Sequence, residues 1–316
     1  MARVLVTGSS GLIGTPLVAA LRGRGDEVVR LVRRPPSAPD EVRWDPGSRR
    51  LDPGVLDGVD AVVHLAGAGV GDRRWTPAYK HEILSSRTDG TAAVASAIAE
   101  TGRDVRFLSG SAVGFYGDRG EEELTEGSPP GAGFLADVVL AWEAAAQPAV
   151  DAGAPVAFLR TGLVLAPPSG SSRSLLKLDR SGVLIDTEGG AAGPLVRLAR
   201  LGLGGPIGSG RQFWPWITLV DEVGAILHLL DHADVTGPVN LTGPEPARQR
   251  EVATALGRAM HRPAVLPAPA FAARLAVGEF AGEIVASQRI VGDVLVASGY
   301  RYTHADLDSA ARWLVG

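Results

Sequence analysis

The chain has 316 residues, of which 45% are apolar and 21% are charged, and its formal net charge is −4. This length and composition suit one large globular domain with a smaller annex, and they exclude a disordered, collagen-like or coiled-coil chain. The sequence contains no cysteine, which excludes a disulfide scaffold, a thiolate metal site and a cysteine nucleophile. Its mildly acidic balance predicts no general attraction to nucleic acid or to an anionic membrane.

Targeting and metal-binding signals are weak. No run of about 18 apolar residues predicts a membrane span, and a strand pattern follows Met1 directly, unlike a signal peptide. We therefore expect a soluble, cytoplasmic protein. The six histidines are scattered, and only His228 and His232 have the i, i+4 spacing of one helix face. Because no HExxH motif accompanies them, we predict no metal site.

Short apolar runs alternate with longer helical patterns through the first half of the chain. The expected strands are residues 4–6, 28–32, 61–65, 105–108 and 156–159. The expected helices between them are residues 12–24, 88–100 and 135–152. Near-continuous apolar runs are typical of strands buried on both faces of a parallel sheet. The alternation predicts an α/β fold with a doubly wound parallel sheet.

The second half of the chain is less regular. Residues 169–192 are rich in serine, glycine and charge, and we interpret them as a loop or excursion of open role. The patterns that follow predict a helix at 225–231, a short strand at 239–241, an amphipathic helix at 248–260 and two or three helices within 271–315. These elements predict a small, mostly helical annex packed on the sheet.

A glycine-rich turn follows the first strand. It has G-x-x-G-x-x-G spacing and comprises Gly8, Ser9, Ser10, Gly11, Leu12, Ile13 and Gly14. In a strand–turn–helix unit, Gly8 permits the tight turn, Gly11 lets the backbone approach a pyrophosphate, and Gly14 lets the helix pack on the strand. The helix start then presents N–H groups to the phosphates. We therefore predict that these seven residues bind a dinucleotide; the alternative is a turn that only packs.

The end of the second strand distinguishes the two nicotinamide dinucleotides. An acidic residue there would bind the ribose 2′-hydroxyl of NAD, but the chain has Arg33 and Arg34. Guanidinium groups can pair with a 2′-phosphate. The sequence therefore favours NADP(H), the alternative being two solvated surface arginines.

Further cofactor contacts are expected at the carboxyl ends of later strands, where open α/β sheets bind their ligands. The candidates are His64, Leu65, Ala66, Gly67, Ser109, Arg160 and Thr161. We interpret His64 as a residue that lines or supports the cofactor cleft rather than as a base.

Several of these segments resemble a known family. TGSSGLIG, HLAG, SGSAVGFYGD and LRTGLVL are similar to motifs of the extended short-chain dehydrogenase/reductases. Residues 73–87, 201–217 and 261–279 resemble the atypical members called sugar-nucleotide epimerase-like proteins, whose C-terminal domain has no defined role. The resemblance implies a Rossmann-type fold that binds NADP(H).

The resemblance also implies two domains. We expect residues 1–165, with a return segment at about 217–241, to form the NADP-binding Rossmann domain. Residues 166–216 and 242–316 would then form the smaller substrate domain.

The resemblance places the catalytic serine of this family at Ser111, but its Tyr and Lys positions fall on Leu135 and Val139. Neither side chain can titrate, so the usual proton donor and acceptor is missing. We expect Ser111 and Tyr116 to carry the chemistry, with both hydroxyls facing the nicotinamide. Asp137, on the same predicted helix, is either an alternative proton source or a surface acid.

A small-molecule substrate is expected between the two domains. The candidate contacts are Lys80, Arg87, Arg211, Trp214 and Trp216. Arginine with aromatic rings suits a flat or anionic ligand, although the segment around the two tryptophans could instead be an interdomain packing strip.

Three functions remain open at this point. We favour an NADP(H)-dependent oxidoreductase or epimerase-like enzyme that acts on a small hydroxy or keto compound. The missing Tyr–Lys pair leaves two alternatives, a non-catalytic NADP(H)-binding redox sensor and a redox-neutral isomerase or lyase on the same scaffold.

Overall fold

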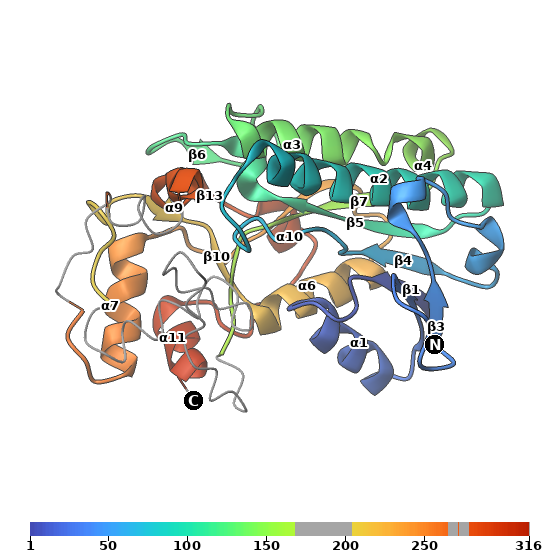
Figure 1. Ribbon diagram of the computed structural model, residues 1–316. Helices are drawn as coiled ribbons and strands as arrows, with labels where there is room; N and C mark the ends of the chain where they lie inside the picture. Colours follow the sequence, from blue (N-terminus) through green and yellow to red (C-terminus); the bar gives the residue numbers. More distant parts are fainter. Residues whose placement is uncertain (168–203, 265–270, 272–277, 316) are drawn as a thin grey trace.

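The computed structural model describes residues 1–167, 204–264, 271 and 278–315 (Figure 1). Its centre is a seven-stranded sheet in the order β11-β7-β5-β4-β1-β2-β3, with every neighbouring pair parallel. The strands are β1 (Arg3–Thr7), β2 (Glu27–Val32), β3 (Glu41–Arg43), β4 (Ala61–His64), β5 (Arg106–Ala112), β7 (Val156–Thr161) and β11 (Gly237–Leu241). The predicted α/β fold with a doubly wound parallel sheet is confirmed.

Helices cover both faces of this sheet (Figure 1). One face carries α1 (Gly14–Gly23) and α6 (Leu219–Asp231). The other carries α2 (Pro77–Thr101), α3 (Phe134–Ala144) and α4 (Gln147–Asp151). Successive strand residues point to opposite faces, so a strand between two helical layers must be apolar throughout.

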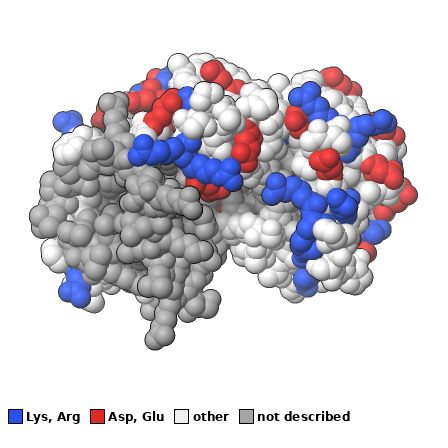
Figure 2. Space-filling model, viewed as in Figure 1, with Lys and Arg blue, Asp and Glu red and all other residues white. Residues whose placement is uncertain are grey.

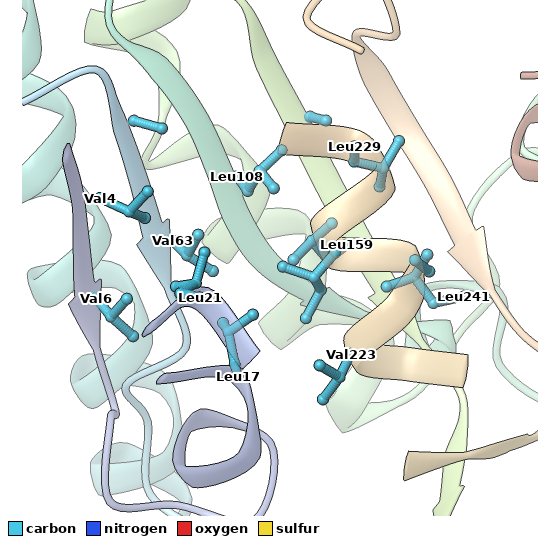
Figure 3. Packing of buried hydrophobic residues seen from close by; sticks show 14 of the residues in the cluster. Val4, Val6, Leu17, Leu21, Val63, Leu108, Leu159, Val223, Leu229 and Leu241 are labelled. Atoms are coloured by element: carbon cyan, nitrogen blue, oxygen red, sulfur yellow. The ribbon is translucent and has the colours of Figure 1, made fainter. Parts of the chain in front are cut away.

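Strand β1 shows this alternation. Val4 and Val6 pack toward Leu17 and Val223 of the first helical layer, in the cluster that Figure 3 shows. Leu5, between them, joins the core under the second layer. All three strand side chains are fully buried. The apolar runs of the sequence therefore form the interior of a three-layer sandwich.

The annex lies beside the β10 end of this sandwich (Figure 1). Its core joins Trp214 and Trp216 to helices α7 (Gln249–Ala259) and α11 (Leu307–Val315). Two two-stranded sheets connect it to the rest: β8 (Leu163–Leu165) with β10 (Trp216–Thr218), and β6 (Glu123–Leu124) with β13 (Arg289–Ile290). A third, β9 (Phe213–Trp214) with β12 (Ala247–Arg248), lies within the annex. The remaining short elements are η1 (Pro46–Ser48), η2 (Pro53–Leu56), η3 (Val113–Tyr116), η4 (Gly278–Phe280), α9 (Ala281–Val285) and α10 (Asp293–Ala297).

The structure corrects several predicted helix boundaries. The helix predicted at 135–152 is divided into α3 and α4, because Pro148 in the first turn of α4 cannot extend the preceding helix. The helix predicted at 88–100 is continuous with the stretch at 77–87, which the sequence also predicts to be helical, and together they form the 25-residue helix α2. Thr76 caps the start of this helix by accepting a hydrogen bond from the N–H of Tyr79. The predicted excursion at 169–192 lies outside the described residues, as does part of the 271–315 segment.

The carboxyl ends of β1, β4, β5 and β7 lie at one edge of the sheet, because all of these strands are parallel. The predicted site residues follow these strand ends. Within the described parts of the chain, no helix is long and apolar enough to cross a membrane.

Candidate cofactor and active site

The glycine turn after β1 combines close packing with one open side. Gly8 has a φ of +66°, and a Cβ atom added there would lie 2.7 Å from the carbonyl carbon of Leu65. A Cβ atom on Gly14 would lie 2.1 Å from the carbonyl oxygen of Gly8. A Cβ atom on Gly11 would meet only that same oxygen, at 3.2 Å. Gly8 and Gly14 are therefore required by packing, whereas Gly11 leaves room for a ligand above the turn.

The start of α1 offers hydrogen-bond donors to an anion. The N-cap residue, Ile13, provides no side-chain cap, and the first turn contains no acidic residue. The first N–H groups of a helix have no partner within the helix, and they form the positive end of its dipole. A phosphate group would satisfy both features, so the turn and helix fit the pyrophosphate of a dinucleotide.

Thr7 and His64 connect the ends of β1 and β4. The Thr7 hydroxyl accepts hydrogen bonds from the N–H groups of Leu65 and Ala66, both at 3.1 Å, and lies 2.8 Å from Nδ1 of His64. His64 is fully buried, and burial lowers its pKa to about 4. The ring is therefore neutral, and with the Thr7 hydroxyl donating to Nδ1 its hydrogen lies on Nε2. This places His64 in a supporting role and makes it a poor base.

Arg33 and Arg34 have different environments. Arg34 donates two hydrogen bonds to Glu41, at 2.7 and 2.6 Å, and this contact lowers the pKa of Glu41 to about 2. Arg33 is exposed and has no hydrogen bond or ion pair with any described residue. Figure 2 shows Lys and Arg side chains on both sides of the hollow in the middle of the molecule. Arg33 is thus the one of the two arginines that is available to a 2′-phosphate, while Arg34 fixes the loop after β2.

Ser111, near the end of β5, contacts a residue that the sequence analysis missed. Its Oγ donates a 2.6 Å hydrogen bond to Oε1 of Glu143 on α3. Both oxygens of Glu143 also accept hydrogen bonds from Arg160, each at 2.9 Å. One signal in the sequence could have identified Glu143, since it follows Leu135 and Val139 at i+8 and i+4 and therefore shares their helix face.

The expected orientation of Tyr116 is wrong. Its side chain is fully buried, and its hydroxyl donates to Oδ1 of Asn240 at 2.7 Å and accepts from Arg160 at 2.9 Å. Burial raises the pKa of its phenol. The turn η3 directs Tyr116 into the protein, where it packs against Phe115 and Val139. Tyr116 cannot face a nicotinamide from this position.

Arg160 and Thr161 end β7 but point to opposite faces of the sheet. Arg160 is buried, and both guanidinium contacts to Glu143 are already made, so this side chain is not free to bind a cofactor. Thr161 donates a 2.8 Å hydrogen bond to Oε1 of Glu222 on α6. Glu222 is fully buried, its Oε2 has no partner among the described residues, and burial raises its pKa to about 8. Ser109 is also fully buried.

Lys80 and Arg87 border the loop that follows β4. Arg87 donates hydrogen bonds to the carbonyl oxygens of Ala68 and Ile83, at 2.9 and 3.0 Å, and burial lowers its pKa to about 10. It also lies against Gly67, where an added Cβ atom would be 3.4 Å from its side chain. Lys80 forms an ion pair with Glu279 of η4. Arg87 thus shapes the loop, and Lys80 connects it to the C-terminal region.

The expectation that Trp214 and Trp216 contact a substrate is wrong. Both are buried in the annex core, where their indole N–H groups donate to the carbonyl oxygens of Ile284 and Glu245. The packing alternative describes them correctly. Arg211 is exposed. Among the residues that the structure describes, no three His, Asp or Glu side chains are placed to hold a metal ion.

Comparisons with known proteins agree with this architecture. The NAD dependent epimerase/dehydratase family matches residues 4–242, and a domain of unknown function, DUF1731, matches residues 268–314. Epimerase family protein Mb2239 of Mycobacterium bovis is 39% identical over 97% of this chain and 95% of its own length. The bovine epimerase family protein SDR39U1 is 36% identical over 99% of both chains.

Solved structures extend the likeness to three dimensions. The human epimerase family protein SDR39U1, crystallised with NADPH, has a TM-score of 0.84 at 32% identity and covers 99% of this chain and 98% of its own. MoeE5, crystallised with UDP-glucuronic acid and NAD, has a TM-score of 0.72 at 23% identity over 99% and 97% of the two chains, which shows the shared fold. The motifs, the sheet order and these matches together establish that the chain belongs to the NAD dependent epimerase/dehydratase family of extended short-chain dehydrogenase/reductases, with a DUF1731 C-terminal domain.

Proposed function

We propose that the chain binds NADP(H) across the carboxyl edge of its sheet and uses it to oxidise or reduce a small hydroxy or keto compound. The observation that carries the cofactor assignment is the uncapped start of α1 behind the open side of Gly11. Those N–H groups and the helix dipole favour an anion, and the pyrophosphate of a dinucleotide supplies one.

Arg33 supports NADP(H) over NAD(H). It is exposed at the end of β2, where an acidic residue would favour a free ribose 2′-hydroxyl. The NADPH in the human SDR39U1 structure is consistent with this choice. When bound, the cofactor supplies the hydride chemistry, so the protein needs only to bind, orient and protect the reacting groups and to move a proton.

In this proposal one part of the chain binds the cofactor and the other binds the substrate. Residues 1–165 and the return segment at about 217–241 hold the cofactor, and the remaining C-terminal region encloses the substrate. Ser111 would contact the substrate, and Lys80 and Arg211 would lie on its route into the site.

One alternative has a specific observation in its favour. Leu135 and Val139 cannot titrate, and Tyr116 is buried in a hydrogen-bonded network. These features favour a protein that binds NADP(H) and reports the redox state of the pool without turnover.

Fluorescence titration with NADPH and NADH tests the cofactor assignment. We expect NADPH to bind more tightly, and Arg33→Asp to remove most of the difference, because a charge-assisted hydrogen bond contributes roughly 1.5–3 kcal/mol. Arg312→Asp, on the exposed face of α11, is the matched control and should leave both affinities unchanged. Equal affinities in the wild type would contradict the assignment.

An activity assay distinguishes the proposed enzyme from the alternative, a redox sensor without turnover. Purified protein is incubated with NADPH and a set of ketones, and with NADP⁺ and a set of secondary alcohols that includes UDP-glucose. A change in absorbance at the nicotinamide band supports the enzyme. Tight NADPH binding without turnover in any reaction supports the sensor.

A further inference from the structure

We propose that Glu143, acting through Ser111, accepts the proton of a substrate hydroxyl in place of the missing Tyr–Lys pair. The inference rests on the proposed redox function and names its proton acceptor. Ser111 is the residue that would touch the substrate, and Glu143 is the positioning residue that holds and receives its proton.

The position of Glu143 follows from the helix that the family uses for its catalytic pair. Leu135, Val139 and Glu143 are four residues apart on α3 and lie on one face. A Cβ atom on Gly114 of η3 would be 3.3 Å from Leu135 and 3.8 Å from Val139, so this face turns toward the end of β5. Glu143, one turn beyond the usual lysine position, is the titratable side chain that this face presents to Ser111.

The hydrogen bond between Ser111 and Glu143 determines whether Ser111 donates a hydrogen bond to a substrate or accepts one from it. A serine hydroxyl has one hydrogen and two lone pairs. At 2.6 Å from the Glu143 carboxylate, which only accepts, the Ser111 hydrogen is already donated. Ser111 is 4% exposed, and its two lone pairs can therefore only accept further hydrogen bonds. An arriving hydroxyl group can supply such a hydrogen bond, whereas a carbonyl group cannot.

Arg160 gives the pair the same charge balance as the residues it replaces. It binds both oxygens of Glu143, and the two side chains are only 5% and 13% exposed. Glutamate with arginine is neutral, as phenolate with lysine is, and each becomes singly positive when it takes up one proton. The same guanidinium also donates hydrogen bonds to the Tyr116 hydroxyl and to the carbonyl oxygen of Glu126. The buried phenol of Tyr116 therefore helps to position Arg160.

The proton and electrons balance in this arrangement. In the direction of oxidation, the substrate hydroxyl proton moves to Oγ of Ser111 while the original Ser111 proton moves to Oε1 of Glu143. The hydrogen on the carbinol carbon leaves with its electron pair for the oxidised nicotinamide that the proposed function supplies, and a carbonyl forms. Reduction is the reverse and requires protonated Glu143.

The first test needs neither cofactor nor substrate. Infrared difference spectra of protein labelled with ¹³C at the glutamate carboxyl carbon, recorded for the wild type minus Glu143→Gln, identify the Glu143 carboxylate band. We expect Ser111→Ala to shift that band, because it removes one hydrogen bond without disturbing the ion pair. Asp151→Asn changes an exposed carboxylate on α4 and should leave the band in place. A band that does not respond to Ser111→Ala overturns the proposal.

The second test measures NADP⁺ reduction with secondary alcohols and UDP-glucose as a function of pH. We expect the wild-type rate to rise to a plateau with pH, because alcohol oxidation releases a proton that the relay must accept. Glu143→Gln and Ser111→Ala should lower the rate by roughly 10²–10⁴-fold, remove this rise and change the NADP⁺ dissociation constant less than twofold. Glu143→Asp keeps a negative charge opposite Arg160, so it should fold even where Glu143→Gln does not, and should restore part of the rate.

The outcomes separate this proposal from the one on which it rests. Asp151→Asn should match the wild type throughout. A Glu143→Gln protein with at least half of the wild-type rate, or a wild type that binds NADP⁺ but oxidises no alcohol, overturns the relay. Failure of the wild type to bind NADP⁺ at all contradicts the proposed function. The infrared experiment still shows, in that case, whether Ser111 donates a hydrogen bond to Glu143.

Discussion

A side chain at Gly11 should affect ligand binding, whereas one at Gly14 should affect folding. A Cβ atom at Gly11 meets only the Gly8 oxygen at 3.2 Å, and the added atoms of valine would occupy the open side of the turn. We expect Gly11→Val to abolish NADPH binding and to change the melting temperature little. Fluorescence titration and circular dichroism melting measure the two effects on one sample.

Gly14→Val is the matched comparison. Its Cβ atom would lie 2.1 Å from the Gly8 carbonyl oxygen, so the turn must shift, at a cost of roughly 1–3 kcal/mol. This variant should be clearly less stable than Gly11→Val. If Gly11→Val binds NADPH as the wild type does, the turn serves packing alone.

Glu222 should make the protein less stable as the pH rises. Burial raises its pKa from 4.5 in the unfolded chain to about 8 in the folded protein, so folding favours the protonated form. The penalty is absent below pH 4.5 and grows by about 1.4 kcal/mol per pH unit. It is complete above pH 8. Glu222→Gln, which cannot ionise, should therefore stabilise the protein much more at pH 8 than at pH 5 in urea unfolding.

Glu41 provides a control, because its effect on stability has the opposite pH dependence to that of Glu222. Arg34 lowers its folded pKa to about 2, so ionised Glu41 stabilises the protein above pH 4.5, and that contribution is lost as the pH falls toward 2. Glu41→Gln should be destabilising at pH 8. Equal effects of Glu222→Gln at the two pH values would show that the carboxyl group is not held neutral.

Single residues were the hardest to place from sequence. The glycine turn was predictable because its requirements are local, within seven consecutive positions. Tyr116, Arg160 and Trp216 were assigned to the cleft by residue type, but each is in the interior with a distant partner. The Tyr116 partner, Asn240, is 124 residues away, and the Ser111 partner, Glu143, is 32 away. Residue type alone does not show on which side of a strand end a polar group finds its hydrogen bond.

At the scale of secondary structure, the sequence was informative where elements are long and fully buried. The six predicted strands correspond to β1, β2, β4, β5, β7 and β11, because burial on both faces requires continuous apolar runs. β3 was missed, since three residues at the sheet edge carry no such run. α2 was predicted as two separate stretches, 77–87 and 88–100, because the first carries polar side chains that bind the loop after β4 and interrupt the apolar stripe.

At the scale of the whole molecule, one buried carboxylate joins the C-terminal segment to the sheet domain. Asp221, in the first turn of α6, is only 1% exposed. Its oxygens accept hydrogen bonds from the N–H groups of Thr303 and His304, at 2.6 and 3.1 Å, and from the Thr218 hydroxyl at 2.6 Å. The Asp221 carboxylate therefore fixes the chain after α10 to α6, beside the hydrogen bonds of Ser298 to His228 and of Tyr300 to the Asp221 carbonyl oxygen.

Asp221→Ala should release this segment. It leaves two backbone N–H groups and one hydroxyl without their acceptor, and an unsatisfied buried group costs roughly 1–3 kcal/mol. We expect a loss of several kcal/mol in urea unfolding and faster amide hydrogen exchange at residues 300–304, while β5 and β7 stay protected. Asp308→Asn, which breaks an exposed ion pair with Arg258, should change neither measurement by more than about 0.5 kcal/mol. Unchanged exchange at 300–304 in Asp221→Ala would mean that Tyr300 and Tyr302, which also pack against the sheet domain, are sufficient to hold the segment.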